Sequence, residues 1–191
     1  MIIEDKAVFL DRDGTINQDL DGYISSPKDF LLFPFTAEAI KIFNTLEYKT
    51  IIVTNQSGIA RGLYTLDHLN TIHNYMISEL KKESAFIDLV LFSPYHPDGI
   101  IKPYNIEHIS RKPQPGMFFE ALHNFPIKAK KSYMIGDKLS DIEFGKANGL
   151  STILVKTGNG KETWKNREKL PILPDFVVEN ILSAAYLIKY L

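Results

Sequence analysis

The sequence predicts an α/β fold, in which a doubly wound and mainly parallel β-sheet is flanked by helices. Short runs of β-branched and aromatic residues alternate along the chain with longer segments whose apolar residues recur at helical spacing. Alternation of this kind is typical of a parallel sheet with helices on both faces. No internal repeat or Ser/Gly-rich linker divides the 191 residues, so we expect a single domain spanning residues 1–191.

Six short apolar runs are the expected strands. Each is rich in β-branched or aromatic residues and too short for a helix, which is the pattern of a strand buried on both faces. The runs cover residues 7–10, 50–54, 87–92, 132–136, 151–155 and 175–179.

Five longer segments between and after these runs are the expected helices. Residues 65–82 place Leu66, Leu69 and Ile72 on one face, and Thr65 has the side chain of an N-cap. The other segments are residues 35–47, 115–125, 139–148 and 179–191. Two long stretches, 12–34 and 93–114, lack a helical pattern, and loops of that length in a compact domain are usually functional.

Composition excludes several classes of protein. The net charge of −1 gives no general attraction to nucleic acid or to an anionic membrane, so we expect neither as a partner. The absence of cysteine excludes disulfides, thiolate nucleophiles and cysteine-ligated zinc. No stretch approaches the roughly 20 apolar residues of a spanning helix, and the charged N-terminus is not a secretory signal. We therefore expect a cytoplasmic monomer or small oligomer, and we favour the monomer.

Polar residues follow the expected strands directly. Ligands of open α/β sheets bind at the carboxyl ends of the strands, so these residues should meet at one edge. They are Asp11 and Asp13 in LDRDGT, Thr54, Asn55 and Ser57 in VTNQSG, and Asp137 and Asp141 in GDKLSD. Arg111 and Lys112, in RKPQPG, stand just before an expected helix.

Each of these residues has a simpler explanation when it is taken alone. An aspartate that ends a strand is commonly a turn former, and a loop lysine is usually solvated. The combination is more specific, because D-x-D-G-T should occur by chance in roughly one chain of this length in several hundred. The joint occurrence of these motifs at strand ends and helix entrances favours a functional site.

The chemistry of these residue types fits a phosphoryl group. A carboxylate can attack phosphorus, and a second carboxylate two residues later can protonate the leaving alkoxide and then accept a proton from water. Mg²⁺ held by oxygen ligands would relieve the repulsion between the phosphate and Asp11, with Asp137 as an additional ligand. Lys112 and the Thr54 hydroxyl would stabilise the phosphoryl oxygens.

The four motifs resemble those of haloacid dehalogenase (HAD) superfamily phosphatases. The longer stretches FLDRDGTIN, VTNQSGIARG and YMIGDKLSD are similar to the branch of heptose 1,7-bisphosphate 7-phosphatases and histidinol-phosphatase domains, over nearly the whole chain. The resemblance implies a HAD-like Rossmannoid fold without a large cap domain. It also implies a Mg²⁺-dependent phosphatase of carbohydrate metabolism, whose sugar-phosphate substrate is D-glycero-D-manno-heptose 1,7-bisphosphate. The product would lead toward activated heptose for lipopolysaccharide biosynthesis.

The resemblance further implies roles for individual residues. Asp11 would be the nucleophile and Asp13 the general acid/base; Thr54 and Lys112 would steady the phosphoryl group as part of the catalytic set. Asp11, the backbone carbonyl of Asp13, and Asp137 would hold Mg²⁺. Asp141 would orient Lys112 or the metal shell. The implied substrate contacts are Asp19, Leu20, Asp21, Gly22, Thr54, Asn55, Gln56, Ser57, Arg111, Lys112 and Lys138.

One departure from the family pattern concerns zinc. Many relatives carry a structural zinc on a C-x-H pair and a C-x-C pair in the second long loop. Ser93 and Tyr95 stand at the first pair here, and His108 and Ser110 at the second. Tetrahedral zinc needs four good nitrogen or sulfur ligands, so we expect no structural zinc and a loop held by packing.

Three alternatives to the heptose phosphatase remain open. A histidinol-phosphate phosphatase would share the motifs and the mechanism. A phosphatase of another polyol or of nucleic-acid ends is the second, and the near-neutral charge counts against it. A non-catalytic phosphosugar-binding module is the third, although Asp11, Asp13, Lys112 and Asp137 are all present.

Two arginines beside the motifs are harder to place from sequence. Arg12 stands between the two acids, and in an extended backbone its side chain would point away from theirs. Arg61, in GIARG, is expected to face the site because it belongs to the VTNQSGIARG match.

Overall fold

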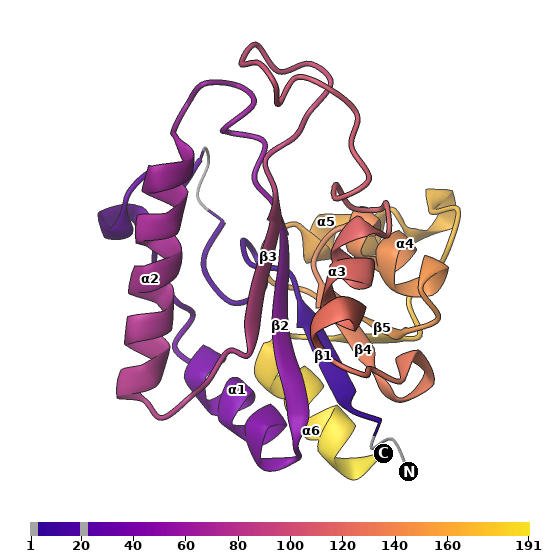
Figure 1. The fold of residues 1–191 in the computed structure, drawn as a ribbon. Coiled ribbons are helices and arrows are strands. Elements are labelled where there is room, and N and C mark those ends of the chain that lie inside the picture. Colours follow the sequence, from indigo (N-terminus) through magenta and orange to yellow (C-terminus); the bar gives the residue numbers. More distant parts are fainter. Residues whose placement is uncertain (1–3, 20–22) are drawn as a thin grey trace.

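A computed structural model describes residues 4–19 and 23–191 of the chain. Within them lies a six-stranded sheet in the order β3-β2-β1-β4-β5-β6, and every neighbouring pair is parallel. The strands are β1 (Lys6–Leu10), β2 (Tyr48–Asn55), β3 (Leu89–Ser93), β4 (Tyr133–Gly136), β5 (Ser151–Val155) and β6 (Phe176–Val178). The order reverses beside β1, as in doubly wound sheets, so the predicted fold class is confirmed (Figure 1).

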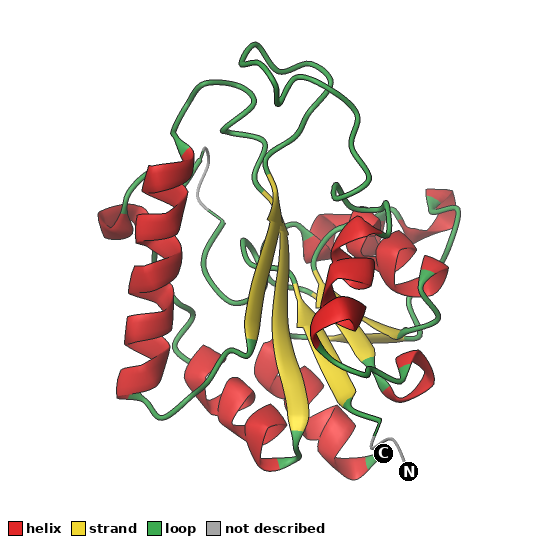
Figure 2. Cartoon of the chain, in the orientation of Figure 1, coloured by secondary structure: helices red, strands yellow, loops and turns green. Residues whose placement is uncertain are grey.

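Helices cover both faces of this sheet (Figure 2). The helices are α1 (Thr36–Thr45), α2 (Leu66–Lys82), α3 (Gly116–Asn124), α4 (Leu139–Ala147), α5 (Gly160–Lys165) and α6 (Ile181–Tyr190). Five of them coincide with the predicted segments to within two residues at either end, whereas α5 lies outside those segments. The Thr65 hydroxyl accepts a hydrogen bond from the backbone N–H of His68 at 3.3 Å, which confirms Thr65 as the N-cap of α2.

Alternate residues of β1 enter two different cores. Val8 and Leu10 pack in one cluster together with buried residues of α1, α2 and α6. Ala7 and Phe9 pack in the other, together with residues of α3 and α4. Both faces of β1 are therefore dry, and an unbroken apolar run is what a central strand with two buried faces requires.

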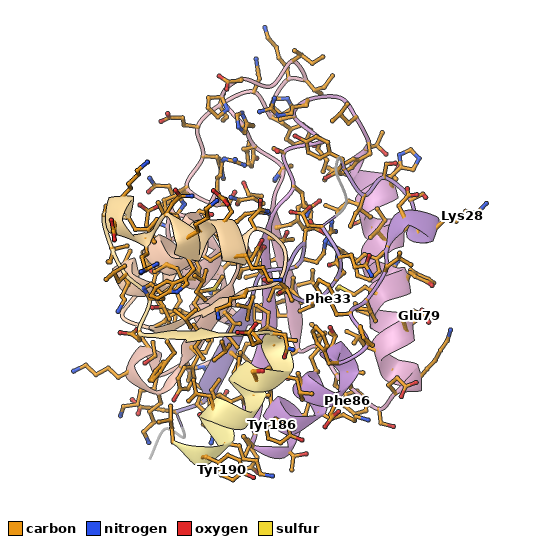
Figure 3. The ribbon with its side chains drawn as sticks, turned by 180° about the vertical axis from the view of Figure 1, so that it is seen from behind. Lys28, Phe33, Glu79, Phe86, Tyr186 and Tyr190 are labelled. Carbon is orange, nitrogen blue, oxygen red and sulfur yellow. The ribbon has the colours of Figure 1, made fainter. Side chains whose placement is uncertain are left out.

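On one face of the sheet, α1 and α6 pack against each other. Tyr186 lies on α6 (Figure 3). Its hydroxyl donates to Glu38 of α1 over 3.0 Å. No helix of the described residues is both long and apolar enough to cross a membrane.

The two long stretches differ in structure. Residues 93–114 form turns and no helix, as predicted. This loop extends above the carboxyl edge of the sheet (Figure 1). The first stretch carries a short 3₁₀ helix, Pro27–Asp29, which begins on a proline whose fixed backbone angle suits a first helical position. Leu20, Asp21 and Gly22, which were expected to contact substrate, lie outside the described residues.

Candidate active site

The parallel strands bring the motif residues to one edge. Asp11 follows β1, Thr54 and Asn55 end β2, and Asp137 follows β4. Since β1 lies between β2 and β4, these side chains stand at three neighbouring strand ends. The sheet order thus produces the convergence that the sequence pattern predicts.

Lys112 joins two of the acids. Its ammonium group donates to Asp11 Oδ1 at 2.9 Å and to Asp141 Oδ1 at 2.6 Å, and the residue is only 3% exposed. Burial alone would lower the pKa of this amine, but the two carboxylates outweigh it and raise the pKa. Lys112 therefore stays charged, and Asp141 accepts one of its hydrogen bonds.

The backbone of Lys112 is held as firmly as its side chain. The Asn55 side-chain amide donates to the Lys112 carbonyl at 3.1 Å, and the Asn55 side-chain oxygen accepts from the Lys112 N–H at 3.0 Å. One amide at the end of β2 thereby fixes the chain direction at the start of the RKPQPG motif.

Three carboxylates form a group that fits a metal ion. One oxygen each of Asp11, Asp137 and Asp141 lies within 4.8 Å of the other two. It is the one such acidic or imidazole group found among residues 4–19 and 23–191. Asp141 already accepts from Lys112 and from the backbone N–H of Lys138 at 3.0 Å, which leaves Asp11 and Asp137 as the freer ligands.

Asp137 has the properties expected of a cation ligand. Its Oδ1 is buried and has no hydrogen-bond partner. Burial, together with the charges of Asp11 and Asp141, raises the pKa of the Asp137 carboxyl to about 8. A buried, unpartnered carboxylate oxygen close to a second acid is suited to Mg²⁺, which prefers few carboxylates plus phosphate oxygens and waters.

Asn159 supports Asp137 and was not singled out from the sequence. Its backbone N–H donates to Asp137 Oδ2 at 2.7 Å and its side-chain amide to the same oxygen at 3.3 Å. The same amide also donates to Asp19 Oδ2 at 3.1 Å. Because Asn159 follows β5 at the carboxyl edge, the strand-end argument could have found it had it been extended to that strand.

Two glycines let the backbone approach Asp137 closely. Gly14 has a φ of +87°, and a Cβ there would lie 2.4 Å from Asp137 Oδ2. A Cβ at Gly158 would also lie 2.4 Å from that oxygen. The glycine of D-x-D-G-T is thus required by its backbone conformation and by the space that the Asp137 carboxylate occupies.

Asp13 is held by donors on three residues. Its Oδ1 accepts from Arg12 Nε at 3.0 Å and Asn17 Nδ2 at 2.9 Å, and its Oδ2 accepts from Arg12 Nη2 at 2.8 Å and Gln56 Nε2 at 2.9 Å. Burial would raise the pKa of this carboxyl, but the Arg12 charge and these hydrogen bonds outweigh it and lower the pKa. Asp13 therefore rests as an ionised carboxylate.

The expected orientation of Arg12 is wrong. Its side chain is 1% exposed and folds back onto its neighbour Asp13 instead of pointing away from it. The alternation rule fails here because β1 ends at Leu10 and residues 12–17 form a turn in which several N–H groups donate to the Arg12 carbonyl.

Thr54 belongs to the same hydrogen-bond network. Its hydroxyl accepts from Gln56 Nε2 at 2.8 Å, and the Tyr64 hydroxyl donates to Gln56 Oε1 at 2.6 Å. Gln56 thus links the strand-end hydroxyl of Thr54 to Asp13.

A cleft of about 290 Å³ opens above these residues. Six of the expected substrate contacts line it: Asp19, Asn55, Gln56, Ser57, Arg111 and Lys138. Asp13 lines it as well, whereas Asp11, Thr54, Lys112 and Asp137 are buried residues that are not part of its lining. Lys138 donates to Asp19 at 3.1 Å; burial would lower the pKa of Lys138, but the surrounding carboxylates, Asp11 and Asp137 foremost, raise it.

Arg111 and Arg61 each contact a residue of the second long loop. Arg111 donates to the Tyr95 carbonyl at 3.2 Å, and Arg61 lies 3.2 Å from His96 Nε2. Burial and the charge of Arg61 lower the pKa of Arg111. Arg61 was expected to face the site, but it is not part of the cleft lining and contacts His96 instead.

Comparison with known proteins places the chain in a family. Residues 109–184 match the HAD-hydrolase-like family. The D-glycero-D-manno-heptose-1,7-bisphosphate 7-phosphatase of Chlorobaculum tepidum is 37% identical over 186 residues, which cover 94% of this chain and 92% of the relative. The corresponding beta-anomer phosphatase of Rhodopseudomonas palustris is 40% identical over 144 residues, 75% of this chain and 79% of its own. The chain belongs to the heptose-1,7-bisphosphate 7-phosphatase family of HAD-like hydrolases.

The solved structures agree with this family. A crystal structure of D,D-heptose 1,7-bisphosphate phosphatase from B. bronchiseptica, complexed with magnesium and phosphate, superposes with a TM-score of 0.87. It is 31% identical, and the match covers 97% of this chain and 98% of that one. The predicted resemblance to HAD phosphatases is confirmed, and so is the prediction that this heptose-phosphatase-family chain is a phosphatase.

In this member of the heptose phosphatase family, the four positions expected to replace zinc ligands contact one another. Ser110 Oγ donates to Ser93 Oγ at 3.0 Å, and His108 Nδ1 lies 2.8 Å from Ser110 Oγ. The Tyr95 ring stacks on the His108 imidazole with centroids 3.8 Å apart. We call these four residues the loop clasp, and they join the two ends of the loop that presents Arg111.

Proposed function

We propose that this chain removes the 7-phosphate of D-glycero-D-manno-heptose 1,7-bisphosphate in a Mg²⁺-dependent reaction with an aspartyl-phosphate intermediate. One observation carries the catalytic part of the proposal: Asp11, at the tip of β1, is fixed by Lys112 and grouped with Asp137, whose buried Oδ1 has no hydrogen-bond partner. The names of the relatives support the substrate.

The proposed reaction uses the two aspartates of the first motif in turn. A carboxylate oxygen of Asp11 attacks phosphorus and the bond from phosphorus to the sugar oxygen breaks. Asp13, which rests ionised, first takes up a proton from solvent through the cleft that it lines and then gives that proton to the leaving sugar oxygen. Asp13 then accepts a proton from a water molecule whose oxygen attacks the same phosphorus. The bond to Asp11 breaks, and inorganic phosphate leaves.

Asp11, the backbone carbonyl of Asp13, and Asp137 are the proposed ligands of Mg²⁺. When bound, the ion would neutralise charge on the phosphate and on the nucleophile. Lys112, already paired with Asp11, would contribute a fixed positive charge to the phosphoryl oxygens, and the Thr54 hydroxyl would add a donor. No rearrangement of the sheet is needed, since all of these groups sit on strand ends or on backbone that Asn55 holds.

The proposed substrate contacts surround the cleft. Lys138 and Arg111 supply positive charge on its lining, and Asp19, Asn55, Gln56 and Ser57 supply oxygens and amides for sugar hydroxyls. Leu20, Asp21 and Gly22 remain predicted contacts on the same first loop. We further propose that residues 1–191 act as one catalytic domain and as a cytoplasmic monomer. Its product would supply heptose for lipopolysaccharide, and no structural zinc would be involved.

The decisive test is phosphate release by the purified protein with Mg²⁺ from a panel of substrates. The panel holds both anomers of the heptose 1,7-bisphosphate, the heptose 7-phosphate and histidinol phosphate. We expect the heptose bisphosphates to give the highest kcat/KM and the 1-phosphate to remain on the product. A preference for histidinol phosphate would overturn the substrate and leave the chemistry standing. Full activity of Asp11→Asn would instead remove Asp11 from the mechanism.

A further inference from the structure

Arg12 is a buried arginine whose guanidinium contacts three other side chains by hydrogen bonding. Nε and Nη2 form a fork on the two oxygens of Asp13, at 3.0 and 2.8 Å. Nη2 also donates to Gln56 Oε1 at 3.2 Å, and Nη1 lies 3.2 Å from His73 Nε2. A planar fork of this kind fixes a carboxylate in both position and rotation, which a lysine cannot do.

His73 completes this arrangement from a different element. It lies on α2, is 6% exposed, and its ring packs 5.7 Å from the ring of Phe92. Burial and the positive charge of Arg12 lower the pKa of His73 to about 3, so the imidazole is neutral and Nε2 accepts from Arg12. The guanidinium also lies 5.9 Å from the ring of Phe30. Helix α2 and the first loop thus enclose the Arg12 side chain.

The burial of Arg12 affects the cleft because Arg12 holds Asp13, and Asp13 lines the cleft. Two residues that line the cleft beside it, Arg12 and Gln56, donate to its oxygens, and the buried Asn17 donates from the other side of the turn. A carboxylate with a second rotamer open to it would spend part of its time away from the leaving oxygen. A misplacement of about 1 Å can lower the rate of an enzyme by about 100-fold.

We propose that Arg12, braced by His73, is a positioning residue that fixes the Asp13 carboxylate for proton transfer to the leaving oxygen. The inference rests on the proposed role of Asp13 as the general acid. Arg12 acts only through Asp13, and His73 acts only through Arg12. Proton transfer contributes about 100- to 10,000-fold to rates, and part of that factor depends on this geometry.

The test compares two substrates that differ in their need for a proton. The alkoxide that leaves D-glycero-D-manno-heptose 1,7-bisphosphate is a strong base, whereas p-nitrophenolate from p-nitrophenyl phosphate is stable as a free anion. For Arg12→Lys we expect kcat/KM on the heptose bisphosphate to fall about tenfold to a hundredfold. On p-nitrophenyl phosphate it should stay nearly unchanged. Equal losses on both substrates would overturn the inference, since a merely structural defect lowers both.

Asp13→Asn separates this inference from the proposed function. If Asp13 is the general acid, that variant loses far more kcat/KM on the heptose bisphosphate than on p-nitrophenyl phosphate. The comparison uses kcat/KM because kcat also includes water attack on phosphorylated Asp11, a step that needs Asp13 with either substrate. Equal losses would refute the role of Asp13 itself, and the inference with it. If Asp13→Asn is selective and Arg12→Lys is not, the proposed function stands and only the positioning role fails. In the double variant, Arg12→Lys should add nothing to Asp13→Asn, and an additive effect would mean that Arg12 acts independently.

His73 provides variants that leave the first motif intact. His73→Phe removes the acceptor for Arg12, and we expect a smaller but equally selective loss on the heptose bisphosphate. His73→Gln supplies an amide oxygen in its place and should restore most of the activity. Arg167→Lys, at an exposed arginine beside Trp164, is the matched control and should leave kcat/KM on both substrates unchanged. Loss of selectivity in His73→Phe, or no rescue by His73→Gln, would contradict the bracing role.

Discussion

Lys112 Nζ lies 2.9 Å from Asp11 Oδ1, although 101 residues separate the two in sequence. The contact exists because the parallel sheet places the end of β1 beside the end of β2, and Asn55 at that end holds the Lys112 backbone. The same ammonium group is 2.6 Å from Asp141, so one cation stands between two buried carboxylates. This arrangement couples the stability of the site to its chemistry.

Lys112→Met should therefore affect both activity and folding. Removing one preorganised donor typically lowers kcat by about 100- to 1,000-fold. It also leaves Asp11 and Asp141 without a countercharge, which lowers the free energy of unfolding by about 3–5 kcal/mol when a buried pair is broken. Steady-state kinetics and urea unfolding at neutral pH measure the two effects. Lys102→Met, at an exposed lysine of the same loop, is the control and should change neither.

Asn159→Ala should weaken magnesium binding without altering the acids themselves. Both donors of Asn159 hold Asp137 Oδ2, and the variant removes the side-chain one at 3.3 Å together with its bond to Asp19. Loss of such an outer partner typically lowers metal affinity by about 10- to 100-fold. The Mg²⁺ concentration giving half-maximal activity, and the Mg²⁺-induced rise in Tm, report this affinity. Asn166→Ala, which loses only hydrogen bonds to Glu162, serves as the comparison. An unchanged Mg²⁺ requirement would show that Asp137 needs no such support.

His73 should make folding stability depend on pH below neutrality. Burial and the charge of Arg12 lower the pKa of His73 to about 3 in the folded protein, whereas a histidine in the unfolded chain has an ordinary pKa of about 6.5. Between these values the unfolded chain binds a proton that the folded protein does not, so stability is full above about 6.5 and is lost as pH falls. From pH 7 to pH 5 the loss is about 2 kcal/mol.

His73→Gln removes this dependence, since glutamine does not titrate. Urea unfolding of the wild type and the variant at pH 7 and pH 5 gives the comparison. We expect the stability of the wild type to fall more steeply than that of His73→Gln. His123→Gln, at an exposed histidine of α3, should keep the wild-type slope. Equal slopes in the wild type and His73→Gln would mean that His73 is protonated in the folded protein.

The sequence predicted most of the sheet and most of the acids, for a physical reason. Buried strands are short apolar runs, and ligands in this fold class gather where those runs end, so Asp11, Thr54 and Asp137 could be placed before any coordinates. Side-chain positions could not be predicted where the backbone leaves the strands and helices. Arg12 lies in a turn to which no periodicity applies, and Asn159 lies between β5 and α5 with no motif around it. Their roles depend on side-chain directions that only the packed turn and the packed loop determine.

The loop clasp gives the last prediction, because it supports a substrate contact. Tyr95 stacks on His108 at 3.8 Å, and the Tyr95 carbonyl accepts from Arg111 at 3.2 Å. Tyr95→Ala removes the stacked ring, and aromatic pairs of this kind contribute about 0.5–1.5 kcal/mol beyond area burial. We expect the looser loop to raise KM for the heptose bisphosphate about threefold to tenfold, the factor to which that energy corresponds. The kcat should change little, because Asp11 and Lys112 are anchored to the sheet.

Two companion variants and one measurement test the clasp. Tyr95→Phe keeps the ring and should keep the wild-type KM, and Tyr190→Ala, at an exposed tyrosine of α6, should have no effect. Elemental analysis of the purified protein should find zinc well below one equivalent, since Ser93 and Ser110 bond to each other and His108 stacks on Tyr95. Stoichiometric zinc, or a Tyr95→Ala variant that loses kcat with an unchanged KM, would show that something other than this packing holds the loop.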